Sequence, residues 1–150
     1  MGPEGHVYAF EPVPAVRDLL QRSIVENAFE ERTTVSSVAL GSANGTARII
    51  TLPLDAGAIN SGGSYLTPHP TPERHQALEV TTATLDSITF PRRVRVLKID
   101  VEGAEPLVLT GAHAFLRQHR PAIICEVNPH QLERTANATP PTISSTSARR

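Results

Sequence analysis

Residues 94–105 read Val-Arg-Val-Leu-Lys-Ile-Asp-Val-Glu-Gly-Ala-Glu, and this stretch decides the fold. β-Branched residues dominate its first half, which is typical of a buried strand. Acidic residues then appear at Asp100 and Glu102, and a glycine turn follows. From Ala104 to His119 apolar residues recur at helical spacing, which predicts one helix. The order of strand, acidic turn and helix predicts an α/β unit. It places Asp100 at the carboxyl end of the strand, where ligands bind in open α/β sheets.

Size, charge and cysteine content limit the class of protein. A chain of 150 residues suits one domain, and its net charge of -1 gives no general attraction to nucleic acid or anionic membranes. Cys125 is the only cysteine, which excludes an internal disulfide and a thiol-based zinc cluster. We find no membrane-spanning apolar run and no signal peptide after Met1. We therefore expect a soluble cytoplasmic protein without nucleic-acid or membrane partners.

Further elements are predicted on both sides of the central stretch. The pattern favours a helix from Pro14 to about Ala28 and strands at residues 6–10, 34–40, 46–52, 78–85 and 121–127. Asn44-Gly45 is typical of a tight turn, so we expect the strands on either side of it to form a hairpin. Glycines and prolines exclude a long regular element from residues 53–76. The chain from Thr135 onward has no periodicity and predicts a disordered tail.

Three acidic residues fall at the carboxyl ends of predicted core strands: Glu11, Asp100 and Glu126. A carboxylate accepts two hydrogen bonds, so Glu11 at such an end can hold both hydroxyls of a ribose. It is equally consistent with a solvated residue ahead of a helix. A divalent metal bound by Asp100, Glu102 and Glu126 is a further alternative, because hard cations take oxygen ligands. We rank this reading below a metal-free site.

Several segments carry a resemblance to a known family. Val7-Tyr8-Ala9-Phe10-Glu11-Pro12, Thr84-Leu85-Asp86 and above all Leu97-Lys98-Ile99-Asp100-Val101-Glu102-Gly103-Ala104-Glu105 resemble the FkbM family of methyltransferases. The resemblance runs from about Gly2 to about Glu126. It implies the use of S-adenosylmethionine on a Rossmann-like class I methyltransferase fold, a three-layer α/β/α arrangement. It also implies a small-molecule hydroxyl acceptor, such as a sugar or a secondary metabolite.

The resemblance assigns roles residue by residue. It implies that Glu11 binds the ribose hydroxyls of the cofactor and that Ala39 lines the adenine pocket. Asp100 would face the methionine end of the cofactor and the acceptor. Methyl transfer to a hydroxyl needs a base but no acid for the leaving group. Asp100 is the candidate base, with Glu102 or Glu126 behind it, whereas Glu105 is expected only as a favourable charge in the first helical turn.

The chain departs from the family in one important respect. The family's glycine-rich strand, loop and helix are not found here, and neither are its last strands. We therefore expect a partial methyltransferase domain over residues 1–134 and a tail over residues 135–150. The missing strand would lie between the strands that end at Glu11 and Asp100, and its absence would leave two unpaired edges.

Other functions remain open on the sequence alone. One is a non-catalytic remnant or interaction module that is stable as a homo-oligomer or with a partner chain that completes the sheet. The other is an NAD(P)-dependent oxidoreductase, which would also place Glu11 on a ribose. The oxidoreductase reading does not explain the acidic block around Asp100.

Overall fold

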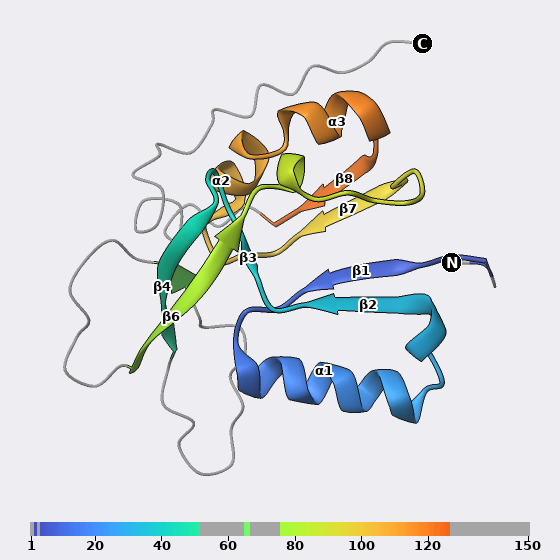
Figure 1. Cartoon of the computed structure of the whole chain (residues 1–150), viewed down its shortest axis with the longest axis horizontal. Coiled ribbons are helices and arrows are strands. Elements are labelled where there is room, and N and C mark those ends of the chain that lie inside the picture. The colour runs from blue at the N-terminus through green and yellow to red at the C-terminus, as the bar shows by residue number, and fades with distance from the viewer. Residues whose placement is uncertain (1, 3, 52–64, 67–75, 127–150) are drawn as a thin grey trace.

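The structure is a computed structural model in which residue 2 and residues 4–51, 65–66 and 76–126 are described. It is a mixed α/β arrangement with three small sheets (Figure 1). Two of the sheets are parallel pairs. Strand β1 (Val7–Phe10) pairs with β2 (Thr33–Ser36), and β7 (Val96–Ile99) pairs with β8 (Ala122–Cys125). All four strands point in the same direction in Figure 1.

The third sheet is mixed and follows the order β3-β6-β4-β5. Its strands are β3 (Ala39–Leu40), β4 (Gly45–Thr51), β5 (Tyr65–Leu66) and β6 (Gln76–Ala83). The predicted hairpin between residues 34–40 and 46–52 is wrong, because β6 lies between β3 and β4. Asn44 does not form a simple two-strand turn. Its Oδ1 accepts hydrogen bonds from the Thr84 N–H (2.9 Å) and the Ser87 hydroxyl (3.0 Å), which ties the turn to the end of β6.

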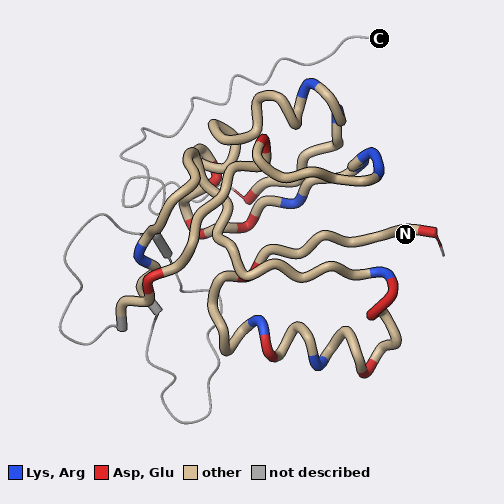
Figure 2. The backbone as a smooth tube through the Cα atoms, in the orientation of Figure 1, with Lys and Arg blue, Asp and Glu red and all other residues tan. Residues whose placement is uncertain are grey.

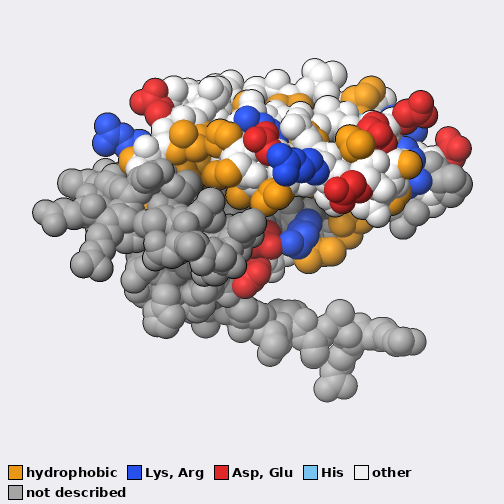
Figure 3. All heavy atoms as spheres, turned by 90° about the horizontal axis from the view of Figure 1, so that it is seen from below, with side chains coloured by type: hydrophobic (Ala, Val, Ile, Leu, Met, Phe, Trp, Pro, Cys, Tyr) orange, Lys and Arg blue, Asp and Glu red, His pale blue; other side chains and the backbone are white. Residues whose placement is uncertain are grey.

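Helix α1 (Pro14–Glu26) connects β1 to the short 3-10 turn η1 (Glu30–Arg32) and β2. Proline suits the first turn of this helix, where its missing N–H costs nothing. No residue of α1 is fully buried, and Leu19 and Val25 remain 42% and 60% exposed. The face seen in Figure 3 accordingly shows hydrophobic side chains among charged ones. None of the helices in the described part of the chain has the length and apolar character needed to cross a membrane.

The predicted helix from Ala104 to His119 is interrupted. It forms α2 (Glu105–Thr110) and α3 (His113–His119), with Gly111 and Ala112 between them. A Cβ at Gly111 would overlap the carbonyl oxygen of Gly41 and lie 3.1 Å from Cβ and Cγ2 of Thr84. The lack of a Cβ at Gly111 therefore lets this segment approach Gly41, which follows β3, and Thr84, which follows β6, more closely than any larger residue allows.

The main core lies between β7 and the two short helices. Its buried members are Leu85, Ile99, Val108, Ala112 and Phe115. A second cluster of Ala39, Ile49 and Val80 lies on the mixed sheet. The predicted strand over residues 34–40 is divided at Ser37 and Val38, so that β2 and β3 belong to different sheets.

The strands that end before Glu11 and Asp100 lie in separate sheets, as the sequence predicts. Within the described residues, β1 and β7 have no strand pairing with each other. Most of residues 53–76 and the whole segment from Thr135 lie outside the described residues. The lack of a long regular element in residues 53–76, the disordered tail from Thr135 and the domain boundary at residue 134 therefore stay predictions.

Candidate active site

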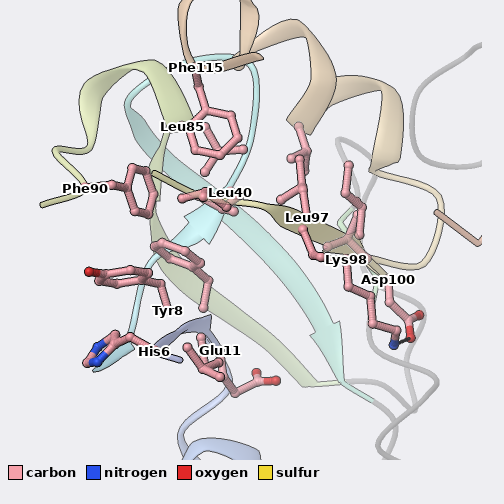
Figure 4. Close-up of a pocket in the computed structure, with 18 of the residues that line it drawn as sticks. His6, Tyr8, Glu11, Leu40, Leu85, Phe90, Leu97, Lys98, Asp100 and Phe115 are labelled. Carbon is pink, nitrogen blue, oxygen red and sulfur yellow. Dashed lines mark hydrogen bonds and ion pairs between the residues drawn. The ribbon is translucent and has the colours of Figure 1, made fainter. Parts of the chain in front are cut away.

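A cavity of about 1610 Å³ lies between β1 and β7. Its walls combine residues of both strands with aromatic side chains from elsewhere in the fold, among them Phe90 and Phe115 (Figure 4). Acidic positions gather where β1 and β7 end, whereas basic positions lie near the start of β7 (Figure 2). The cavity therefore has an apolar interior and an acidic side at the carboxyl ends of the strands.

Glu11 directly follows β1 and is half-buried. Its Oε1 accepts a hydrogen bond from the Val13 N–H at 2.8 Å, which fixes the carboxylate at the start of α1. Burial raises the pKa of Glu11 above its ordinary value, and the Val13 hydrogen bond and the Arg17 charge oppose this shift. A carboxylate held in this way has a second oxygen available for a ligand.

Asp100 directly follows β7 and forms an ion pair with Lys98, with Nζ and Oδ2 2.6 Å apart. Both side chains are exposed, at 66% for Lys98 and 42% for Asp100. The hydrogen bond to Asp100 is the main reason that the pKa of Lys98 is raised. In Figure 4 this pair lies across the cavity from Glu11. Residues two apart on a strand share a face, so this pairing could have been found in the sequence.

The turn after Asp100 is held by Glu105, which is only 5% exposed. Its Oε1 accepts hydrogen bonds from the N–H groups of Val101 and Gly103, both at 3.2 Å. Within this turn Glu102 and Gly103 adopt positive φ angles of 52° and 95°. Glu105 is thus more than the favourable first-turn charge that the sequence suggests, because it fixes the backbone that presents Asp100 and Glu102.

The structure brings together four of the five predicted site residues. Glu11, Ala39, Asp100 and Glu102 all line the cavity, and Ala39 is 6% exposed. Glu126 is not among the lining residues. It follows β8, and its N–H donates to the Ile99 carbonyl at 3.3 Å. No group of three or more metal-ligating side chains was found within the described residues.

The family model for the Methyltransferase FkbM domain matches residues 1–144 of the chain. The chain belongs to the FkbM methyltransferase domain family. Among solved structures, this FkbM domain is similar to the crystal structure of methyltransferase FkbM from Methylobacillus flagellatus KT, with a TM-score of 0.52 and 19% sequence identity. The similarity covers 80% of this chain but only 25% of that protein. A comparison with curated proteins found no match.

The segment Thr84-Leu85-Asp86 of this FkbM domain has a structural role that the sequence did not reveal. These residues open the 3-10 turn η3 (Leu85–Ser87), whose Ser87 N–H donates to the Thr84 hydroxyl. Asp86 accepts hydrogen bonds from the N–H groups of Ala114 (3.0 Å) and Phe115 (2.7 Å), so it caps α3 from a distant segment. These bonds lower the pKa of Asp86. Through Asp86 this segment fixes the start of α3 near the end of β6.

Proposed function

We propose that this domain is an S-adenosylmethionine-dependent methyltransferase with a partial Rossmann-like class I fold, and that its acceptor is a hydroxyl group of a sugar or a secondary metabolite. Membership of the FkbM family supports methyl transfer in general. The observation that carries the proposal further is that Glu11, Ala39 and Asp100 line one cavity, with Glu11 and Asp100 at the carboxyl ends of β1 and β7. Ligands of open α/β sheets bind at this position.

The residues present fit the proposed cofactor. Oε1 of Glu11 accepts a hydrogen bond from the Val13 N–H, whereas Oε2 has no hydrogen-bond partner among the described residues and can accept a hydrogen bond from a ribose hydroxyl. Ala39 is small and buried, and a flat adenine ring can pack against its methyl group. The carboxylates of Asp100 and Glu102 give this end of the cavity a negative charge, which suits a sulfonium.

When bound, the cofactor supplies an electrophilic methyl group. The protein's part is then to position the acceptor and to remove its proton. Asp100 would orient the acceptor hydroxyl and accept that proton, while Lys98 holds the carboxylate by the 2.6 Å ion pair. Glu102 would support the same end of the cavity. Glu126 lies outside the lining, so we assign it no contact with cofactor or acceptor.

Calorimetric titration with S-adenosylhomocysteine tests this proposal. We expect the purified chain to bind and Glu11→Gln to weaken binding by about tenfold or more, which corresponds to about 1.4 kcal/mol. Gln retains an acceptor for the Val13 N–H, so the turn is preserved. Glu30→Gln, on the exposed η1 turn, serves as the matched control and should bind like the unmodified chain.

Two results would contradict the proposal. Equal affinity of the Glu11→Gln variant would remove Glu11 from the ribose site. Absence of binding in a chain shown to be folded by circular dichroism would instead identify a domain that has kept the family fold without the cofactor site.

A further inference from the structure

Arginines gather at the amino ends of β7 and β8, the end of the fold opposite the carboxyl ends that present the acidic site residues. The segments 92–95 and 117–120 contribute five of the chain's 14 basic residues: Arg92, Arg93, Arg95, Arg117 and Arg120. All five side chains are exposed. Figure 2 shows basic positions on the loop before β7 and on α3 at one end of the molecule. We call these five residues the arginine patch.

Hydrogen bonds hold the two segments of the patch side by side. Nε of Arg93 donates to the His119 carbonyl at 3.0 Å, and the Val94 N–H donates to Nδ1 of His119 at 3.2 Å. The Ala122 N–H donates to the Arg95 carbonyl at 2.9 Å, next to the first paired residues of β7 and β8. These bonds fix the backbone that carries the arginines, so their positive charges are held close together.

The charges of the arginine patch are not neutralised within the described residues. The ion pair found there lies at the carboxyl end of β7 and includes none of the five arginines. Acidic residues border the patch on two sides. Asp86 lies within electrostatic reach of Arg117, but its carboxylate oxygens accept N–H groups at the start of α3. Arg92 donates to the backbone carbonyl of Glu4 at 3.2 Å rather than to its carboxylate. The patch therefore keeps a net positive charge that attracts anions.

Arg120 shows that a charged side chain is kept in the patch at a cost to the backbone. It is the C-cap of α3 and has a φ of 48° and a ψ of 55°, in the left-handed region. Glycine adopts this conformation most easily and is the usual residue at such a helix end. An arginine retained in this conformation indicates a use for its side chain.

The chemistry and extent of the patch favour a partner that carries carboxylates. A guanidinium binds a carboxylate through a pair of parallel hydrogen bonds. A nucleic acid would extend its phosphates past the patch toward Glu4 and Asp86, and a single strand needs exposed aromatic rings on which its bases stack. The rings beside the patch do not supply this surface, because Phe90 is half-buried and His119 is buried. A short acidic segment can contact the arginines alone.

We propose that the arginine patch is a docking site for an acidic segment of a partner protein, in which several Asp or Glu residues follow one another. Bidentate contacts between guanidinium groups and carboxylates would hold the segment, and the positive charge would speed its association. Arg117 and Arg120 do not line the cavity, so the site extends onto the outer surface. The partner would leave the carboxyl ends of β1 and β7 uncovered. This site does not depend on the proposed methyl transfer.

Fluorescently labelled hexaglutamate tests the proposal on the chain as it stands. We expect saturable binding by fluorescence anisotropy at about 10 mM salt, and an affinity at least about tenfold lower at about 150 mM salt, where screening is stronger. The double variant Arg117→Gln/Arg120→Gln should weaken binding by about tenfold. Neither arginine side chain has a hydrogen bond within the described residues, so the variant should keep its fold.

The double variant Arg22→Gln/Arg48→Gln is the matched control. It removes the same amount of charge from exposed arginines of α1 and β4, and its affinity should stay within about twofold of that of the unmodified chain. Arg95→Gln/Arg117→Gln replaces the first variant if circular dichroism shows that the first variant is unfolded. No binding at low salt, or an equal loss of affinity in the control, would overturn the proposal. Tighter binding of an oligonucleotide of equal charge, or of phosphatidylserine vesicles, would also overturn it, because the partner would then belong to another class.

Discussion

Gly111 provides the sharpest test of how the helical segment packs. Its φ of -84° and ψ of 13° are ordinary for any residue, so Gly111→Ala tests packing alone rather than backbone freedom. The new methyl group would overlap the Gly41 carbonyl oxygen and press on Thr84 at 3.1 Å. The overlapped atom belongs to the backbone, so it cannot move aside as the end of a flexible side chain would.

The expected loss of stability follows from these contacts. Overpacking typically costs 1–3 kcal/mol, and overlap with a backbone atom places this site at about 3 kcal/mol. Alanine also lowers the entropy of the unfolded chain, which returns about 0.4–1 kcal/mol. The net expectation is a decrease of about 2 kcal/mol in the free energy of unfolding, measured by urea denaturation followed by circular dichroism.

Gly41→Ala is the matched control for this experiment. A Cβ at Gly41 meets no atom within 4 Å, so this variant should unfold at the same urea concentration as the unmodified chain or slightly higher. A Gly111→Ala chain as stable as the Gly41→Ala chain would refute the close approach of the two segments.

Three further predictions concern single carboxylates. Asp86→Asn should lower the free energy of unfolding at neutral pH, because Asp86 caps α3 and its pKa is lowered. In urea titrations the difference from the unmodified chain should shrink as pH falls below 3.8 and vanish once Asp86 is protonated in the folded state. A pH-independent difference would contradict this role. Glu105→Ala should cost about 2 kcal/mol because it removes the acceptor of the buried Gly103 N–H and of the partly buried Val101 N–H. Glu105→Gln keeps an acceptor and should lose less in the same denaturation assay. Because burial raises the pKa of Glu11, affinity for S-adenosylhomocysteine should fall on acidification with a midpoint above pH 4.5. Calorimetry on Glu11→Gln should show no such fall. A midpoint below pH 4.5 would indicate that another group titrates.

Local patterns predicted the elements whose periodicity is strong. The strand that ends at Ile99, the helix that begins at Pro14 and the placement of Glu11 and Asp100 at strand ends all follow from spacing and composition. The resemblance to the FkbM family predicted the separation of β1 from β7. These features depend on neighbouring residues or on a motif, so a single sequence contains the information needed to predict them.

The remaining features depend on contacts between distant segments. Asn44-Gly45 has the composition of a hairpin turn, but the pairing of β6 with both β3 and β4 overrides that preference. The helical periodicity of residues 104–119 hides both the break at Gly111 and the close approach of the Gly41 carbonyl to that residue. Glu105 also looks like an ordinary first-turn acid until the turn after β7 folds over it.

The most direct test of the proposed cofactor site is a titration of the isotope-labelled chain with S-adenosylhomocysteine, followed by two-dimensional amide NMR. We predict chemical-shift changes concentrated at Glu11, Ala39 and Asp100 and in the turn that follows Asp100, because these residues line the cavity and Glu11 and Asp100 follow the strands that border it. Changes confined to other parts of the chain, or an unchanged spectrum of a folded protein at saturating ligand, would contradict the assignment of this cavity as the cofactor site of a methyltransferase.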